Sequence, residues 1–225
     1  MAIGVSFVIP VLNEEGAVAD LLRDLRQCYP HSQLIVVDGG SRDRTVALAL
    51  PLCDQLLLSD SGRARQMNLG GQVASMPYVF FLHADSCPSV SGSALEAYLV
   101  ARPAWGFCRV RLSSERLPFR IVEWFMNQRS RMTSVATGDQ MMFVKKTVFD
   151  ESGGFDDIPL MEDVAYCKRL RRVQTPIIIQ APVLTSSRRW EEGGVVLTVL
   201  RMWLLRLAYF LGVAPATLWR YYYGR

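Results

Sequence analysis

The sequence predicts an α/β protein with a mostly parallel sheet flanked by helices and a C-terminal amphipathic helical tail. Short apolar runs rich in Val, Ile and aromatic residues alternate with helical segments through the first 110 residues. Strand–helix–strand order of this kind forms parallel sheets through right-handed crossovers. No linker interrupts the first 190 residues. We therefore expect one domain over residues 1–190 and a tail over residues 191–225 that is not an independent domain.

Each element is expected from its own pattern. The first four strands are short apolar runs, which is typical of buried strands. The first helix has apolar residues at three- and four-residue spacing from Val18 to Leu25. The second half is less regular. The expected strands are 3–9, 34–37, 55–58, 78–82, 105–112, 140–144 and 177–179, and the expected helices are 14–28, 42–50, 63–74, 89–100, 118–132 and 162–172.

Composition excludes several classes of protein. Half of the residues are apolar and 20% are charged, which excludes a disordered chain. The five cysteines are scattered without C-x-x-C spacing, so we expect no zinc or redox site and a reducing, cytoplasmic location. The formal charge of +4 is concentrated in the last 38 residues. A nucleic-acid binder more often spreads its basic residues over the fold, so we expect no nucleic-acid partner.

Polar residues follow three of the expected strands. They are Asn13 and Glu14 after the first strand, Asp38 after the second and Asp85 after the fourth. Each one alone is equally well explained as a helix N-cap. Parallel sheets bind ligands beyond the carboxyl ends of their strands. Three polar strand ends together therefore favour a ligand cleft.

The candidate residues suit a nucleotide diphosphate. The P-loop, the G-x-G-x-x-G turn and the G-x-S-x-G elbow are all missing from the sequence. Asp38 can accept hydrogen bonds from a ribose hydroxyl or a base N–H. Arg63 and Arg65 suit phosphate oxygens, with a solvated helix face as the alternative. Asp85 ends a very apolar strand, where an unpaired carboxylate is costly, and a bound Mg²⁺ or Mn²⁺ would remove that cost.

Eight segments resemble, in their order along the chain, the motifs of family 2 glycosyltransferases with the GT-A fold. They are VIPVLNEE (8–15), VVDGGSRDRT (36–45), GRARQMNLG (62–70), FLHAD (81–85), TGDQ (137–140), GGFD (153–156), MED (161–163) and RRW (188–190). The GRARQMN and HADS segments also resemble a small bacterial subgroup linked by name to arsenosugar biosynthesis. The resemblance covers nearly the whole chain.

The resemblance implies a role for each matching residue. Asp163 would be the general base, supported by Glu162, and Asp85 would hold the metal. Gly138 and Asp139 fall in the acceptor-side pattern. The residues implied to bind the donor are Pro10, Asn13, Glu14 and Asp38 at the base and ribose, Arg63 or Arg65 at the diphosphate, and Arg189 and Trp190 closing over it.

Two positions depart from the family pattern. His83 stands where the family usually has Asp, so its contact with the ribose or the metal stays open. The last element lacks the usual Gln before Arg189 and Trp190.

The tail has its own pattern. Residues 195–213 contain only two charges, Arg201 and Arg206, and the residues after them are aromatic and basic. A charge-free face runs through Leu197, Leu200, Leu204, Leu207 and Leu211. Aromatic and basic residues beside an apolar helix suit a membrane interface. The alternatives are docking on the chain's own domain and a homodimer through the C-terminal helix. If the tail does contact a membrane, we expect a peripheral position on its inner face.

The function predicted is an inverting glycosyltransferase. It would take its sugar from a UDP-, GDP- or TDP-linked donor, use Mg²⁺ or Mn²⁺, and transfer to an unknown acceptor. One rival is a sugar-nucleotide pyrophosphorylase, which would need a Gly-rich basic loop where residues 11–15 read VLNEE. Another is a non-catalytic module that binds a nucleotide sugar or a membrane.

Overall fold

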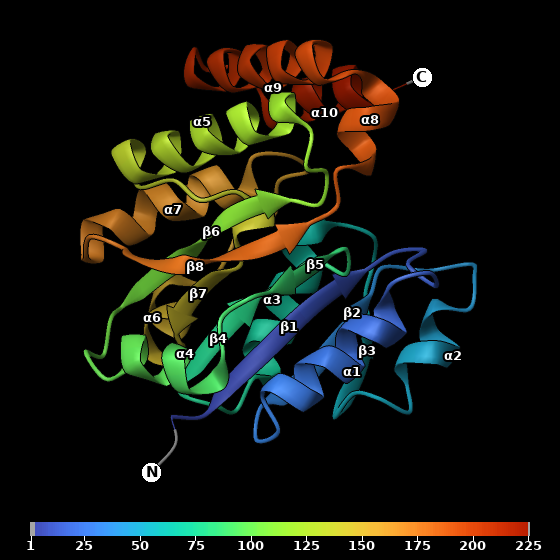
Figure 1. Ribbon diagram of the computed structural model, residues 1–225, viewed down its shortest axis with the longest axis vertical. Helices are drawn as coiled ribbons and strands as arrows, with labels where there is room; N and C mark the ends of the chain where they lie inside the picture. Colours follow the sequence, from blue (N-terminus) through green and yellow to red (C-terminus); the bar gives the residue numbers. More distant parts are fainter. Residues whose placement is uncertain (1–2, 225) are drawn as a thin grey trace.

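The computed structural model describes residues 3–224, apart from the side chains of Arg189, Trp190, Glu192 and Val196. One eight-stranded sheet runs through the molecule, with helices packed on both of its faces (Figure 1). The strand order is β3-β2-β1-β4-β7-β6-β8-β5. The α/β class and the helical tail predicted from the sequence are confirmed.

The first half of the chain builds the parallel part of the sheet. Strand β1 (Val5–Val11) lies between β2 (Gln33–Asp38) and β4 (Tyr78–Phe81), and β3 (Gln55–Leu58) pairs with β2. All three pairings are parallel, as the alternation of strands and helices predicts. The carboxyl ends of β1, β2 and β4 therefore meet at one edge of the sheet.

The second half adds antiparallel strands. Strand β7 (Met142–Lys145) pairs antiparallel with both β4 and β6 (Trp105–Leu112). Strand β8 (Ile177–Thr185) runs parallel to β6 and antiparallel to β5 (Ser86–Pro88). The sequence analysis missed β5 and the second half of β8. Both segments contain a proline, which supplies no N–H to a ladder and weakens the strand pattern.

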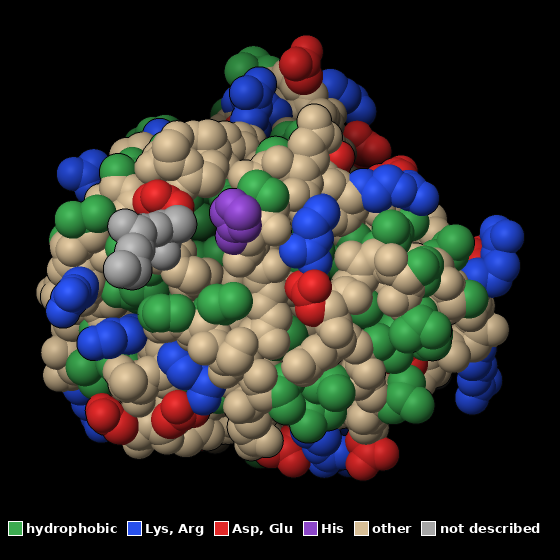
Figure 2. All heavy atoms as spheres, turned by 90° about the horizontal axis from the view of Figure 1, so that it is seen from below, with side chains coloured by type: hydrophobic (Ala, Val, Ile, Leu, Met, Phe, Trp, Pro, Cys, Tyr) green, Lys and Arg blue, Asp and Glu red, His purple; other side chains and the backbone are tan. Residues whose placement is uncertain are grey.

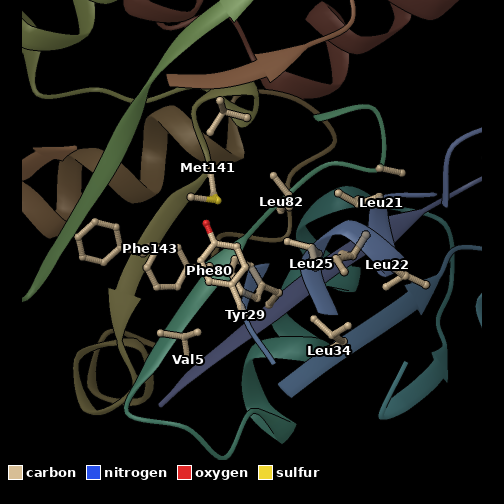
Figure 3. Packing of buried hydrophobic residues seen from close by; sticks show 14 of the residues in the cluster. Val5, Leu21, Leu22, Leu25, Tyr29, Leu34, Phe80, Leu82, Met141 and Phe143 are labelled. Carbon is tan, nitrogen blue, oxygen red and sulfur yellow. The ribbon is translucent and has the colours of Figure 1, made fainter. Parts of the chain in front are cut away.

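Two layers of helix cover the sheet. A buried cluster on one face joins β1 and β4 to α1 and α4, and Figure 3 shows Tyr29 among Leu25, Leu34 and Phe80 there. A second cluster on the other face joins the sheet to α3 and α7. The helices are α1 (Val18–Cys28), α2 (Thr45–Ala49), α3 (Arg63–Val73), α4 (Gly92–Leu99), α5 (Leu117–Thr133), α6 (Lys146–Ser152), α7 (Glu162–Val173), α8 (Arg188–Gly193), α9 (Val195–Phe210) and α10 (Pro215–Tyr223).

Residue 140 differs from its predicted strand. It ends the short 3-10 helix η1 (Gly138–Gln140). The Gln140 side chain turns back to accept a hydrogen bond from the backbone N–H of Thr137 at 3.1 Å. It is fully buried and also accepts from Ser130 Oγ at 2.7 Å. These bonds fix a turn before β7 begins at Met142.

The tail is two helices rather than one. The expected helix over residues 195–213 ends at Phe210, and Gly212 at φ 90° lets the chain turn into α10. Leu205 of α9 and Leu218 of α10 are buried in the same cluster as α3 and α7. The tail therefore packs on the domain. No helix within residues 3–224 has the length and apolar character needed to cross a membrane.

Candidate functional site

The loops after β1 and β2 are tied together at the carboxyl edge of the sheet. Asn13 takes a left-handed conformation at φ 56°, which asparagine tolerates better than most residues. Its backbone N–H donates to Ser41 Oγ, and its Oδ1 accepts from the N–H of Arg42, both at 2.8 Å. The N–H of Glu14 donates to Thr45 Oγ1 at 2.7 Å. Asn13 and Glu14 are thus brought beside the loop that follows Asp38.

Asp38 ends β2 as a buried carboxylate with one oxygen occupied and one free. Its Oδ2 accepts hydrogen bonds from the N–H groups of Gly40 and Ser41 at 2.9 and 3.0 Å. Its Oδ1 is buried and has no hydrogen-bond partner among the described residues. A buried acceptor without a partner costs free energy. A ligand hydroxyl or N–H would satisfy it, as the sequence analysis expects at this residue.

Gly39 lies where α3 approaches this edge most closely. A Cβ at residue 39 would lie 2.9 Å from Gln66 Nε2. That nitrogen donates to the carbonyl oxygens of Val11 and Val37 at 2.9 and 2.8 Å. The side chain of Gln66 therefore joins α3 to the ends of both strands, and glycine at residue 39 leaves room for it. Pro10, in β1, is partly buried just before this edge.

The two arginines of α3 have different surroundings. Arg63 lines a pocket with Glu162 and Asp163, and its Nη1 lies 3.6 Å from Glu162 Oε1. Burial acts to lower the pKa of Arg63, but the charges of Glu162 and Asp163 outweigh it and raise that pKa. Arg65 instead makes an exposed ion pair in which its Nε lies 2.9 Å from Asp157 Oδ1. The structure brings Arg63, and not Arg65, into the pocket.

Glu162 and Asp163 begin α7 after Met161, which has a left-handed backbone at φ 70°. Glu162 is only 4% exposed. Burial, and after it the charge of Asp163, raises the pKa of Glu162 to about 7, and Arg63 opposes the shift. Asp163 has a different environment. Its Oδ1 accepts from the N–H of Val164 at 2.7 Å, and its Oδ2 from the N–H of Gly138 at 3.2 Å.

The other wall of this pocket joins the end of β4 to η1. His83 lines it, and a Cβ at Gly138 would lie 2.3 Å from the imidazole Cε1. Glycine at residue 138 therefore allows the imidazole to lie against the backbone. His83 Nδ1 lies 4.0 Å from Asp139 Oδ1. The candidate acceptor-side residues Gly138 and Asp139 thus adjoin His83 and Asp163.

Asp85 is exposed, whereas the sequence analysis expected a desolvated carboxylate at the end of an apolar strand. Its side chain is exposed, so the cost of burying a carboxylate at the end of an apolar strand does not arise. The error came from β4, which ends at Phe81, four residues earlier. Ser86 Oγ donates to Asp85 Oδ1 at 3.2 Å.

The carboxylates of the described residues suit one kind of metal site. Within the described part of the chain, no three His, Cys, Asp or Glu side chains cluster as a ready metal cage. Mg²⁺ is usually held by one or two carboxylates together with substrate phosphates and water. An exposed Asp85 carboxylate at the carboxyl edge of the sheet fits that kind of site. It does not fit a metal held by protein ligands alone.

Arg189 and Trp190 were expected to close over the donor. Their backbone belongs to α8, but their side chains lie outside the described residues. Their role stays a prediction.

The sequence analysis missed two arginines near Asp163. Arg129 lies in α5 and Arg206 in α9, and the charge of Asp163 acts on the pKa of both. In the sequence, Arg206 was counted only as one of two charges in an apolar helix. The packing of α9 exposes the pKa of Arg206 to the charge of Asp163, and no local sequence pattern encodes that packing.

Part of the chain is similar in sequence to a known enzyme family. Residues 6–98 match the family model described as glycosyl transferase family 2. No curated protein sequence matches the chain.

Solved structures share the fold at low sequence identity. The S. aureus TarS fragment 1–349 in complex with UDP aligns with a TM-score of 0.65 and 13% identity over 81% of this chain. The mannosyltransferase PcManGT from Pyrobaculum calidifontis, in complex with GDP-Man and Mn²⁺, aligns with a TM-score of 0.59 and 19% identity, also over 81%. The chain spans 60% of the TarS fragment and 56% of the mannosyltransferase. Residues 6–98 are therefore similar to glycosyl transferase family 2, within a chain that shares the GT-A fold of these solved structures.

Proposed function

We propose that this chain is an inverting glycosyltransferase that moves a sugar from a nucleotide diphosphate to an acceptor hydroxyl. The observation that carries the proposal is the pocket that joins Arg63 to Asp163 at the carboxyl edge of the sheet. It places a cation suited to a diphosphate beside a carboxylate suited to act as a base. The unsatisfied oxygen of Asp38 supports a nucleoside at the same edge.

The residues divide the reaction between them. Asp163 takes the proton of the acceptor hydroxyl while the hydroxyl oxygen forms a bond to C1 of the sugar. The bond from C1 to the diphosphate breaks on the opposite face, so the anomeric centre inverts. Arg63 stabilises the negative charge that develops on the leaving diphosphate. A Mg²⁺ or Mn²⁺ ion held by Asp85 would neutralise part of the same charge.

The backbone orients the proposed base. Two N–H groups, from Gly138 and Val164, donate to the two oxygens of the Asp163 carboxylate. Glu162, beside it, is buried, and burial raises its pKa. We assign Asp163 as the base and Glu162 as the group that positions Arg63.

The donor class follows from the relatives. TarS has been solved with UDP and with UDP-GlcNAc, and the mannosyltransferase with GDP-Man and Mn²⁺. We therefore propose a UDP-, GDP- or TDP-linked sugar as the donor. A thermal-shift screen of these three donor classes, with and without Mn²⁺, tests the proposal. At least one nucleotide sugar should raise the unfolding temperature in a metal-dependent manner. No shift with any of them would contradict the proposal.

A second proposal concerns the surface formed by α5, α9 and α10. These helices pack against one another, α5 on α9 and α9 on α10. Of the 22 large hydrophobic side chains that are exposed among the described residues, 16 lie in α5 or in residues 195–223. We call these 16 the apolar surface: Leu117, Ile121, Trp124, Phe125, Met132, Leu197, Leu200, Trp203, Leu204, Leu207, Phe210, Leu211, Val213, Trp219, Tyr221 and Tyr223.

We propose that this apolar surface contacts a membrane peripherally. The leucine face predicted from the sequence points away from the domain, and Leu197 and Leu211 are 67% and 72% exposed. No acidic residue follows Glu192, whereas Arg201 and Arg220 lie among the aromatic side chains. Tryptophan, tyrosine and arginine together suit an anionic lipid interface. A second copy of the chain is the competing occupant of this surface. Sedimentation with vesicles distinguishes it from a membrane.

The opposite end of the molecule differs. Figure 2 views the molecule from below Figure 1, away from α5 and α9, and shows basic, acidic and hydrophobic side chains interspersed. The concentration of exposed apolar side chains is thus a property of one end of the molecule.

A further inference from the structure

Two of the motifs quoted from the sequence, GRARQMNLG (62–70) and GGFD (153–156), meet through one side chain. Asn68 of α3 donates from Nδ2 to the carbonyl oxygen of Phe155 at 2.8 Å, and its Oδ1 accepts from the N–H of Phe155 at 2.7 Å. The side-chain amide of Asn68 thus pairs with both polar groups of one backbone residue. This pairing ties α3 to the loop between α6 and α7.

Glycine at residue 154 makes room for the pairing. Its backbone is left-handed at φ 70°, and a Cβ there would overlap Asn68 Oδ1. Gly153 is also left-handed, at φ 74°, but a Cβ there would have no atom of the described chain within 4 Å. Gly153 is therefore required by the turn alone, whereas Gly154 is required both by the turn and by the close approach of Asn68.

The same loop is bonded to α7, the helix that carries the proposed base in its first turn. Arg169 of α7 donates from Nη2 to the carbonyl oxygen of Gly154. The ring of Phe155 packs on that of Tyr166, with centroids 4.5 Å apart, and Tyr166 lies about one helical turn after Asp163. Asn68 and the loop thus connect α3 to α7.

Arg63 and Asp163 reach the pocket from these two helices. Both line it, and so does Phe155. Arg63 precedes Asn68 by five residues in α3. In the proposed reaction Arg63 stabilises the leaving diphosphate while Asp163 takes the proton, so the rate depends on how the two helices are placed. A misplacement of about 1 Å, caused by a residue far from the chemistry, costs about 100-fold in rate.

We propose that Asn68 is a positioning residue of the transfer reaction, which holds the loop before α7 against α3 and so fixes Asp163 relative to Arg63. This inference rests on the proposed glycosyltransferase function. Asn68 acts through the backbone of Phe155 and not by contact with a substrate. The competing explanation is that the pairing only stabilises the fold.

Asn127 offers a matched control, because it makes the same pair of hydrogen bonds elsewhere. Its Nδ2 donates to the carbonyl oxygen of Val110, and its Oδ1 accepts from the N–H of Val110, both at 2.9 Å. Both asparagines are partly buried. Asn68→Ala and Asn127→Ala therefore remove equivalent bonds, and thermal unfolding should show similar losses of stability in the two variants.

The first test measures the rate and the donor affinity of the full chain separately. UDP-GlcNAc, GDP-Man and TDP-glucose are the probes, and water replaces the acceptor in single-turnover hydrolysis. Asn68→Ala should lower the hydrolysis rate constant about 10- to 100-fold, while calorimetry shows a donor affinity within about threefold of the wild type. Asn127→Ala should change neither quantity more than about threefold, although it loses the same two hydrogen bonds.

A second pair of variants separates the pairing from the strain of the turn. Gly154→Ala and Gly153→Ala both place a side chain on a left-handed backbone, but only the first displaces Asn68. Gly154→Ala should therefore lower the hydrolysis rate constant more than Gly153→Ala does. In the Asn68→Ala background this difference should shrink, because the obstructed side chain is gone.

Hydrogen exchange tests the same geometry without a substrate. Asn68→Ala should speed exchange over residues 153–164, which contain the loop and the start of α7. Asn127→Ala should speed exchange around Val110 of β6 instead.

Two results would overturn the inference. One is a hydrolysis rate constant for folded Asn68→Ala equal to that of Asn127→Ala. The other is unchanged exchange at the start of α7 in Asn68→Ala, which would show that α7 keeps its place without the pairing. Hydrolysis of none of the three donors by the wild type would count against the proposed function, and hydrogen exchange would still decide whether Asn68 holds α7.

Discussion

The two halves of the chain build their parts of the site in different ways. In the first half, Asn13, Asp38 and Arg63 lie at the ends of parallel strands or at the start of the next helix. In the second half, Gly138 comes from a short 3-10 helix and Asp163 from the start of α7. The proposed donor side thus follows from chain order, and the proposed acceptor side from tertiary packing.

This difference matters for function. A parallel sheet with short loops fixes the edge where a nucleotide binds, whatever the acceptor is. Helices packed outside the sheet can change without disturbing that edge. Residues of the two halves meet in one pocket, so variants can show whether each half contributes separately to donor binding and to proton transfer.

The largest effect should come from the proposed base. Asp163→Asn keeps an oxygen that can accept the hydrogen bond from Gly138 or Val164, but it cannot take a proton. We expect normal folding and a turnover lower by about 10²- to 10⁴-fold, the usual contribution of general base catalysis. A single-turnover transfer or donor-hydrolysis assay measures it. Turnover within a few-fold of the wild type would exclude Asp163 as the general base and leave Asp139 or Asp156 as the next candidates.

Asp85→Asn should affect the donor side instead. Loss of the carboxylate should weaken Mn²⁺-dependent donor binding at least about 10- to 100-fold. Metal sites lose that much affinity even when the residue removed only forms a hydrogen bond to a metal ligand. Because Asp85 is exposed, the fold should not change. Calorimetry with and without Mn²⁺ measures both affinities. An unchanged metal dependence in the variant would remove Asp85 from the metal site.

The pH dependence of stability should reveal the buried carboxyl group of Glu162, beside the proposed base. The pKa of Glu162 is raised from an ordinary 4.5 to about 7 in the folded chain. The folded state therefore binds this proton more tightly than the unfolded state. The resulting stabilisation is complete below about pH 4.5 and is lost as the pH rises through about 7. Burial is the main cause of the raised pKa of Glu162, the charge of Asp163 adds to it, and the charge of Arg63 opposes it.

Glu162→Gln removes this titration. Urea unfolding from pH 4.5 to 8 should show the wild type losing stability relative to the variant as the pH rises. Parallel stability curves for the two proteins would show that Glu162 has an ordinary pKa.

The smallest effect concerns the apolar surface. The full chain should sediment with anionic vesicles, less so at high salt, because screening weakens the attraction of the arginines. Trp203→Ser should reduce the bound fraction about tenfold, since it removes a large apolar side chain from the interface. Leu58→Ser, at an exposed residue of β3, is the matched control and should leave binding unchanged.

Two outcomes would contradict membrane contact. One is no binding to anionic vesicles at low salt. The other is a concentration-dependent dimer that Trp203→Ser dissociates while vesicles have no effect, which would assign the apolar surface to a second copy of the chain.

The sequence predicted the first half of the fold well because strand, turn and helix signals are local there. The polar strand ends at residues 13, 38 and 85 were found in this way. The exposure of Asp85 was not predicted, because the run of apolar residues does not show that β4 ends at Phe81. β5 and the end of β8 exist only through pairing with each other and with β6. The leucine face of α9 was recognised, but which side of the helix packs on the domain depends on Leu205 and Tyr209 meeting α7 and its neighbours.

The central claim is that donor recognition and proton abstraction belong to different halves of the chain. The calorimetric affinity for the nucleotide sugar, measured for Asp38→Asn and Asp163→Asn, tests it most directly. In Asp38→Asn, one amide position can keep the turn bonds to Gly40 and Ser41, while the other replaces the unsatisfied acceptor. We predict weakened donor binding in Asp38→Asn and wild-type affinity within a few-fold in Asp163→Asn. Equal loss of donor affinity in both variants, or wild-type affinity in Asp38→Asn, would contradict the account.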